Sequence, residues 1–204
     1  MFKFTKLVLL VGISLSFLAC SGYQQAMKVL PSELTQLNVE CKRDNINFEM
    51  DCYDLLSSKN SFAQLRLGIH AQSLGKVEEA FERYTKAQKA GNFYANALLS
   101  DLYANGIGVE FNEKKAISLL QDAEEVDPIA AYKLSFYYLS HNNSQKAIEL
   151  LIFAATNGLK DAQKELVLIY SNNQYIDENK EQAMYWDSAY QNGEQDFARR
   201  IYGR

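Results

Sequence analysis

The sequence has no surplus of positive charge, and this absence removes one class of function. Its 204 residues carry 21 basic and 25 acidic side chains, a formal net charge of −4. Nucleic-acid-binding domains instead gather lysine and arginine on one face. The charge balance therefore argues against nucleic acid as a partner.

Proline and glycine are also scarce, at 2 and 10 residues. Both residues interrupt helices, so a chain with few of them favours helical runs joined by short turns. At this length the chain can form one domain with a sizeable hydrophobic core. The composition predicts a single, mainly helical domain.

Signatures of catalysis and cofactor binding are missing as well. The chain contains no nucleophile elbow, phosphate-binding loop or dinucleotide fingerprint. His70 and His141 each stand without a second histidine or a cysteine at metal-ligand spacing. We therefore expect a protein that is not an enzyme and that binds no cofactor and no metal. A cell-envelope enzyme is the least favoured alternative.

The N-terminal hydrophobic run is too short to cross a membrane. Leu7–Leu18 has twelve residues without a charge, and a helix of that length rises about 18 Å against a hydrocarbon core of roughly 30 Å. Lys3 and Lys6 precede the run, an arrangement typical of a secretory signal peptide. Residues 1–19 are therefore predicted to be removed. The mature chain then has 19 basic against 25 acidic side chains, a net charge of −6.

The end of this segment, Phe17-Leu18-Ala19-Cys20, resembles the lipobox of bacterial lipoproteins. In that family the cysteine carries lipid and becomes the first mature residue, and leucine is usual where Phe17 stands. An ordinary secretory signal cleaved near Ala19 is the alternative. The resemblance implies a lipid anchor on Cys20. Ser21 after it implies sorting to the outer membrane of a Gram-negative cell.

Two cysteines remain beyond the anchor, Cys41 and Cys52. An even pair outside the cytoplasm favours a disulfide. Metal binding is the alternative, but two thiolates with no histidine nearby make a poor zinc site. The pair predicts an N-terminal cap over residues 32–60, closed by a Cys41–Cys52 disulfide. A tether over residues 20–31 would join this cap to the anchor.

A pattern of small and apolar residues recurs four times after residue 60. In each occurrence an alanine is followed at +4 and +8 by alanine, leucine or tyrosine. Residues four apart share one face of a helix, so each occurrence predicts an amphipathic helix. The spacings of 32, 35 and 32 residues predict four stacked units. Their starting alanines are Ala63, Ala95, Ala130 and Ala162.

A second helix is predicted in every unit. Its pattern has apolar residues at 0, +4 and +7, and a residue at +11, usually glycine, placed to end the helix in the left-handed region. The four patterns start at Ala80, Ala116, Ala147 and Gln182.

Capping residues agree with this periodicity. Ser61 with Gln64 predicts a capping box at the first repeat helix. Asp127 followed by Pro128 predicts the start of a later helix. The last segment, Asp196–Tyr202, predicts a short closing helix.

The segment ANALLSDLYANGIGVEFNEKKA, Ala95–Ala116, resembles a Sel-like repeat, a longer relative of the tetratricopeptide repeat. Its most specific part is the Tyr-Ala-Asn-Gly-Ile-Gly-Val run at 103–109. The first and third units have shorter turns and look more like tetratricopeptide repeats, while Asp127 and the Gln182 frame depart from the pattern. The resemblance implies an all-α, right-handed superhelical solenoid of about four helix-turn-helix repeats over residues 61–204.

In the tetratricopeptide family, partners bind the first helix of each pair on the concave side of the superhelix. The matching positions here are rich in apolar and aromatic side chains, which are typical of protein interfaces. Packing against neighbouring helices is the alternative for any one of them. The predicted partner-binding residues are Phe62, Leu65, Ile69, Tyr94, Asp101, Tyr132, Phe136, Lys164 and Leu168. The same offsets also reach Ala97, Ile129, Leu139 and Asp161.

These features predict an outer-membrane-anchored, periplasm-facing module that binds another envelope protein, as adaptor or scaffold of an assembly or a secretion system. The alternative is a periplasmic immunity protein that neutralises a secreted toxic effector, for example a type VI lipase. Both functions put the partner in the concave groove, so the identity of the bound protein separates them.

Overall fold

A computed structural model describes residues 25–172, 174–193 and 196–203. The regular elements of these ranges are all helices, as the low content of proline and glycine predicts. The predicted signal peptide, residues 1–19, and the predicted anchor Cys20 lie outside the described residues. Within them, no helix combines the length and the hydrophobicity that crossing a membrane requires.

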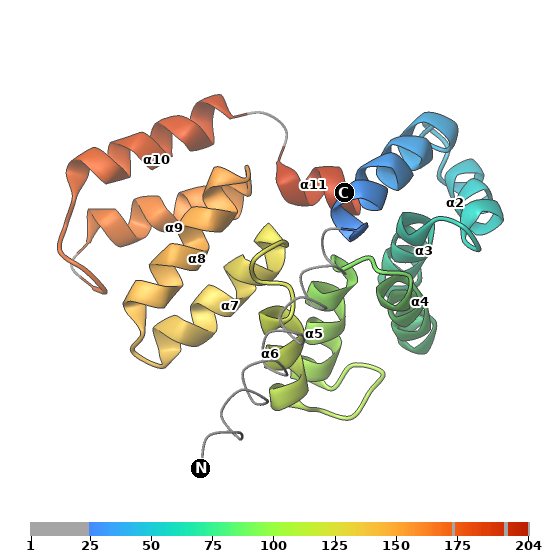
Figure 1. The fold of residues 1–204 in the computed structure, drawn as a ribbon, viewed down its shortest axis with the longest axis horizontal. Coiled ribbons are helices and arrows are strands. Elements are labelled where there is room, and N and C mark those ends of the chain that lie inside the picture. Colours follow the sequence, from blue (N-terminus) through green and yellow to red (C-terminus); the bar gives the residue numbers. More distant parts are fainter. Residues whose placement is uncertain (1–24, 173, 194–195, 204) are drawn as a thin grey trace, which may run out of the picture.

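The body of the molecule is a stack of four antiparallel helix pairs, which confirms the predicted solenoid (Figure 1). Each pair packs on the next, because one pair alone would leave an apolar face in water. The pairs are α3 (Ser61–Ser73) with α4 (Val77–Lys89), α5 (Ala95–Asn105) with α6 (Glu113–Gln121), α7 (Pro128–Ser140) with α8 (Ser144–Thr156), and α9 (Lys160–Ser171) with α10 (Lys180–Asn192).

Small residues lie where the helices approach most closely. All four starting alanines of the first helices are completely buried. Ala80, Ala116 and Ala147 of the second helices are buried as well. The predicted frame of the first three units is therefore confirmed, and the alanine stripes lie in the core of the stack.

The fourth unit departs from the predicted frame at its first position. The side chain of Asn179 caps α10, and Ala183 lies four residues after it. Ala116 and Ala147 lie at the same offset from the caps of α6 and α8. Ala183 is buried, while the predicted start, Gln182, is only half-buried. Trp186, the +4 residue of the predicted frame, is buried as predicted.

The predicted capping box at the first repeat helix is also wrong. Asn60 caps α3, because its side-chain oxygen accepts a hydrogen bond from the Ala63 N–H. The Ser61 hydroxyl instead donates to Glu33 in the helix over 25–40, and Gln64 donates to the Ser57 carbonyl. Polar residues at this helix start thus join the cap to the first repeat.

Of the other predicted helix ends, one cap and two glycines are confirmed and one glycine is not. Asp127 caps α7, with Pro128 in its first turn, as predicted. Gly91 and Gly158 have φ values of +90° and +86°, the left-handed conformation predicted for them. Gly193 does not, because its φ is −68°, outside the left-handed region.

An N-terminal helical hairpin precedes the repeats. It consists of a helix over residues 25–40 and α2 (Ile46–Leu56), and a disulfide links Cys41 to Cys52 as predicted. Leu30 and Leu37 of the first helix are buried in the common core. Packed structure therefore starts before the predicted cap boundary at residue 32, and the predicted tether overlaps it from residue 25 onward.

Removing this disulfide is expected to lower the free energy of unfolding by about 2–3 kcal/mol, because the crosslink restricts the unfolded chain. The variant carries both Cys41→Ser and Cys52→Ser, so that no free thiol is left. Urea unfolding of this variant and of the wild-type protein, each with and without reductant, measures the effect. Reductant should shift the wild-type midpoint only. Equal midpoints for oxidised wild type and the double variant would contradict the expectation.

Gly68 marks the closest approach between the two helices of the first unit. A Cβ atom added to Gly68 would lie 2.6 and 2.7 Å from the Cε1 and Cδ1 atoms of Tyr84. The Tyr84 ring is fully buried, and its hydroxyl donates to Gln72 at 2.7 Å. The ring therefore cannot retreat, and glycine is required by space rather than by backbone conformation.

In the next two units the residues at these two positions differ in size from those of the first unit. Five residues after the starting alanine they have serine instead of glycine, and at the position of Tyr84 they have leucine. The pairs are Ser100 with Leu120, and Ser135 with Leu151. A smaller residue on one helix thus accompanies a larger one on the other.

Gly68→Ser is expected to destabilise the fold by about 1–3 kcal/mol, the usual cost of overpacking a core. Combining it with Tyr84→Leu recreates the pairing of units two and three and should recover most of the loss. Thermal unfolding of the two single variants and the double variant measures the coupling. Additive losses would mean that the two side chains do not compete for this space.

Candidate functional site: the concave face

The first helices of the four units, α3, α5, α7 and α9, carry the predicted partner-binding residues. The structure divides these residues into two groups. A covered half comprises Phe62, Leu65, Ile69 and Tyr94, and an open half comprises Tyr132, Phe136, Lys164 and Leu168.

Side chains of the covered half do not face water, which corrects the prediction of an exposed groove there. Phe62 and Leu65 have 1% and 0% of their surface exposed, and Ile69 and Tyr94 are buried as well. The alternative interpretation, packing against the protein itself, is the right one for these four. Ala97, Ile129 and Leu139 are buried too.

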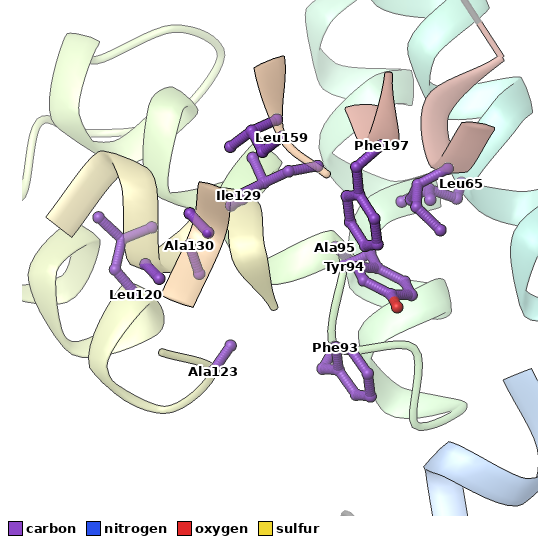
Figure 2. Packing of buried hydrophobic residues seen from close by; sticks show 14 of the residues in the cluster. Leu65, Phe93, Tyr94, Ala95, Leu120, Ala123, Ile129, Ala130, Leu159 and Phe197 are labelled. Carbon is purple, nitrogen blue, oxygen red and sulfur yellow. The ribbon is translucent and has the colours of Figure 1, made fainter. Parts of the chain in front are cut away.

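The C-terminal helix α11 (Phe197–Tyr202) packs over part of the covered half, at Tyr94 and Leu65 (Figure 2). Phe197 points toward Tyr94, with their ring centroids 6.0 Å apart, and Leu65 lies on the other side (Figure 2). The Tyr202 hydroxyl donates to the Tyr94 carbonyl at 3.2 Å. Phe197 and Ile201 are both buried. The predicted closing helix therefore exists, but it folds back to the first two units (Figure 1).

Both ends of α11 are held by polar contacts. At its start, the Phe197 N–H donates to the Gly158 carbonyl, and the Lys160 N–H donates to the Asp196 carboxylate. At its end, the Arg66 guanidinium donates to the carbonyls of Ile201 and Arg200 at 3.0 and 3.1 Å. Because α9 follows Gly158 and α3 contains Arg66, α11 connects the last unit to the first.

Arg66 is a mostly buried cation of the covered half. Burial lowers its pKa from the ordinary value, opposed by Tyr53 and Glu49. Carbonyls in the last turn of a helix lack partners within the helix and carry partial negative charge. The guanidinium therefore satisfies the end of α11.

The open half presents an aromatic pair. Tyr132 and Phe136 lie one turn apart on α7 and meet edge to face, with ring centroids 5.0 Å apart. Phe136 is 40% exposed, and Leu168 on the neighbouring helix α9 is 50% exposed. Lys164, one turn before Leu168, is exposed. These side chains form a partly apolar surface that faces solvent.

Charges around this aromatic pair come from three helices. Lys133 pairs with Asp101, with N–O distances of 2.8 and 3.0 Å, which ties α7 to α5. The pKa of Tyr132 is raised by burial and, further, by the carboxylates Asp161 and Glu165 of α9. Asp101, a predicted contact residue, is thus engaged within the protein.

A hollow of about 350 Å³ adjoins Phe136 between α5, α6 and α7. Phe111, 63% exposed, and Ile117 contribute apolar surface to it, and the Asp101–Lys133 pair lies at its wall. The prediction missed Phe111, because the repeat pattern treats the long turn of the second unit as a connection only. Its sequence signal was an aromatic residue inside a turn rich in glycine.

The two histidines lie apart. His70 is in α3, whereas the His141 ring follows α7 and its Nδ1 lies 2.8 Å from the Tyr137 carbonyl oxygen. Among the described residues, no three histidine, cysteine or acidic side chains are grouped closely enough to hold a metal ion.

Solved structures similar to this chain include two proteins with Sel-like repeats. A Sel1 repeat protein from Oxalobacter formigenes is 24% identical over 74% of this chain and 66% of its own length, with a TM-score of 0.64. A protective antigen of uropathogenic Escherichia coli strains that displays an SLR fold is 27% identical, over 82% of this chain and 40% of its own, with a TM-score of 0.59. The chain thus has the Sel-like repeat fold that the segment Ala95–Ala116 resembles.

This chain spans less than two thirds of the antigen and just under two thirds of the Sel1 repeat protein. An immunity protein from Pseudomonas aeruginosa is 18% identical over 91% of this chain and 86% of its own, with a TM-score of 0.49. No family model and no curated protein matches the sequence.

Proposed function

We propose that this protein is a protein-interaction module of the bacterial envelope, anchored to the outer membrane through Cys20 and facing the periplasm. Its partner is a component of an envelope assembly or secretion system. The observation that carries this proposal is the exposed aromatic surface on the first helices of a repeat fold. The partner contacts Tyr132, Phe136 and Leu168.

The chemistry of the open half supports a protein ligand. Aromatic side chains commonly supply most of the binding energy of an interface, surrounded by polar residues that exclude water. Phe136 and Leu168 offer apolar area on two adjacent helices, and Lys164 lies beside Leu168. The hollow next to Phe136 has the size to receive a side chain of a partner.

The proposed anchor would keep this surface near the membrane. Cys20 lies five residues before the start of the described helix over 25–40. Five extended residues reach about 17 Å at most. The repeat domain would therefore bind partners only close to the inner surface of the outer membrane.

Phe136→Ala is expected to weaken partner binding by about 2 kcal/mol or more, roughly thirtyfold, as truncation of a hot-spot aromatic does. Stability should change by about 0.5 kcal/mol only, because the side chain is largely exposed. Copurification from detergent-solubilised envelopes, quantified by mass spectrometry, measures binding, and thermal melting measures stability.

Met184→Ala is the matched control, since Met184 on α10 is 74% exposed and lies outside the concave face. Its copurified proteins should equal those of the wild type. If Phe136→Ala and Met184→Ala retain the same proteins, the open half is not the binding surface. A secreted toxin among the proteins lost with Phe136→Ala would support the immunity function instead of the adaptor.

A further inference from the structure

The covered half of the concave face already holds a helical segment, and the way it does so indicates a second binding site. We propose that the surface under α11, formed by Leu65, Arg66, Tyr94 and Gly158 and called its seat below, is a peptide-docking site (Figure 2). A short amphipathic helix of the partner binds there by displacing α11. This inference rests on the proposed function in taking the ligand to be a protein. The inference adds the sequence pattern that the ligand's docking helix must have.

The apolar part of the seat selects the spacing of the incoming side chains. Phe197 contacts the Tyr94 ring, and Ile201, four residues later, is buried on the same face of α11. Residues four apart share one face of a helix. Tyr202 follows, with its hydroxyl on the Tyr94 carbonyl. A matching ligand carries an aromatic residue, an aliphatic residue four positions on, and then a tyrosine.

The polar part of the seat binds backbone groups at both ends of α11, in addition to the Asp196 carboxylate that accepts from the Lys160 N–H. Arg66 binds two terminal carbonyls of α11, and Gly158 accepts from the first backbone N–H of the helix. Any helix of similar length offers the same groups at its ends. The seat is therefore not restricted to the sequence of α11.

One position after the helix must stay small. Gly203 has a φ of +76°, and a Cβ there would collide with the Arg66 guanidinium. Left-handed backbone favours glycine here, and a larger residue would also push the Arg66 guanidinium away from the end of α11. The ligand segment therefore has glycine directly after its tyrosine.

The covered half lies next to the start of α7. Tyr94 and Phe197 lie beside Ile129 at the start of α7, the helix that carries Tyr132 and Phe136 (Figure 2). A six-residue helix is far below the length that is stable alone in water. α11 therefore forms only while it is seated, and a longer partner segment competes for its place.

The test uses a fluorescent synthetic peptide of residues 193–204 as the probe and fluorescence anisotropy as the readout. The mature wild-type chain, in which α11 fills the seat, should bind the peptide weakly. The full-length Phe197→Ala chain, whose own helix is weakened, should bind it at least tenfold more tightly. A Met184→Ala chain should behave as the wild type does, and a peptide carrying Phe197→Ala should bind none of them.

Three results would overturn the proposal. They are equal binding of the wild-type and Phe197→Ala chains, equal binding of the unsubstituted and substituted peptides, and loss of the cooperative melting transition in the Phe197→Ala chain. The last would make α11 part of the core. None of these measurements contains the natural partner, so failure here leaves the Phe136→Ala result, and with it the proposed function, intact.

Discussion

Replacing Cys20 with serine is expected to release the protein from the membrane. Serine has no thiol to carry the lipid, and each methylene buried in a bilayer contributes about 0.8 kcal/mol. An anchor of several acyl chains, as in the lipoproteins whose lipobox the sequence resembles, therefore contributes more than any single contact in the folded domain. Incorporation of labelled fatty acid and fractionation of membranes measure the two consequences.

The chain offers a matched control for this experiment. Cys41→Ser with Cys52→Ser also removes cysteines, but these two form the disulfide of the N-terminal hairpin. That double variant should incorporate as much label as the wild type and remain in the membrane fraction. Lipid labelling that persists in Cys20→Ser would show that the anchor is elsewhere or absent.

Asp127 is expected to make the stability of the fold depend strongly on pH. The residue is completely buried at the start of α7, and one oxygen accepts from the Ile129 N–H at 2.9 Å. Its other oxygen, Oδ2, has no hydrogen-bond partner among the described residues. Burial raises the pKa of the carboxyl from 3.8 to about 7, opposed by the N–H groups of Ile129 and Ala130 and by Lys133.

Whether stability rises or falls with pH depends on whether the folded or the unfolded chain holds the proton. Between about pH 4 and pH 7 the folded protein keeps a proton on Asp127 that the unfolded chain has already lost. The free energy of unfolding contributed by this group is therefore largest below pH 4, falls as the pH rises to 7, and is constant above. The difference between the two pKa values corresponds to a decrease on the order of 4 kcal/mol.

Asp127→Asn tests this expectation, because asparagine keeps the capping oxygen and cannot ionise. Urea unfolding between pH 4 and pH 8 should show a shallower dependence on pH for this variant than for the wild type. Glu125→Gln removes an exposed carboxylate two residues away and should leave the dependence unchanged. Identical pH profiles for wild type and Asp127→Asn would mean that Asp127 ionises normally in the folded protein.

Local periodicity was enough to predict the repeat units. A buried alanine stripe constrains residues that are close in sequence, so Ala63 or Ala147 can be found without knowing what packs across them. The frame failed where this constraint is weak. In the fourth unit glutamine stands at the first position of the pattern, and the buried alanine, Ala183, lies one residue later.

The covered half of the face could not be predicted in the same way. Phe197 and Ile201 indicate a short amphipathic helix, but the sequence does not say which surface it covers. That surface depends on Arg66 and Tyr94, which lie about a hundred residues away in the chain. Phe62 and Leu65 therefore looked like groove residues, whereas Tyr132 and Phe136, beyond the reach of α11, are accessible.

The central claim is that the open half contacts a protein, and a photocrosslinking amino acid at position 136 tests it most directly. Introduced in place of Phe136 and irradiated in intact cells, it should yield one discrete crosslinked product of higher mass. The same amino acid in place of Met184 should yield none. A product from position 184 but not from position 136 would contradict the assignment of the concave surface as the binding site.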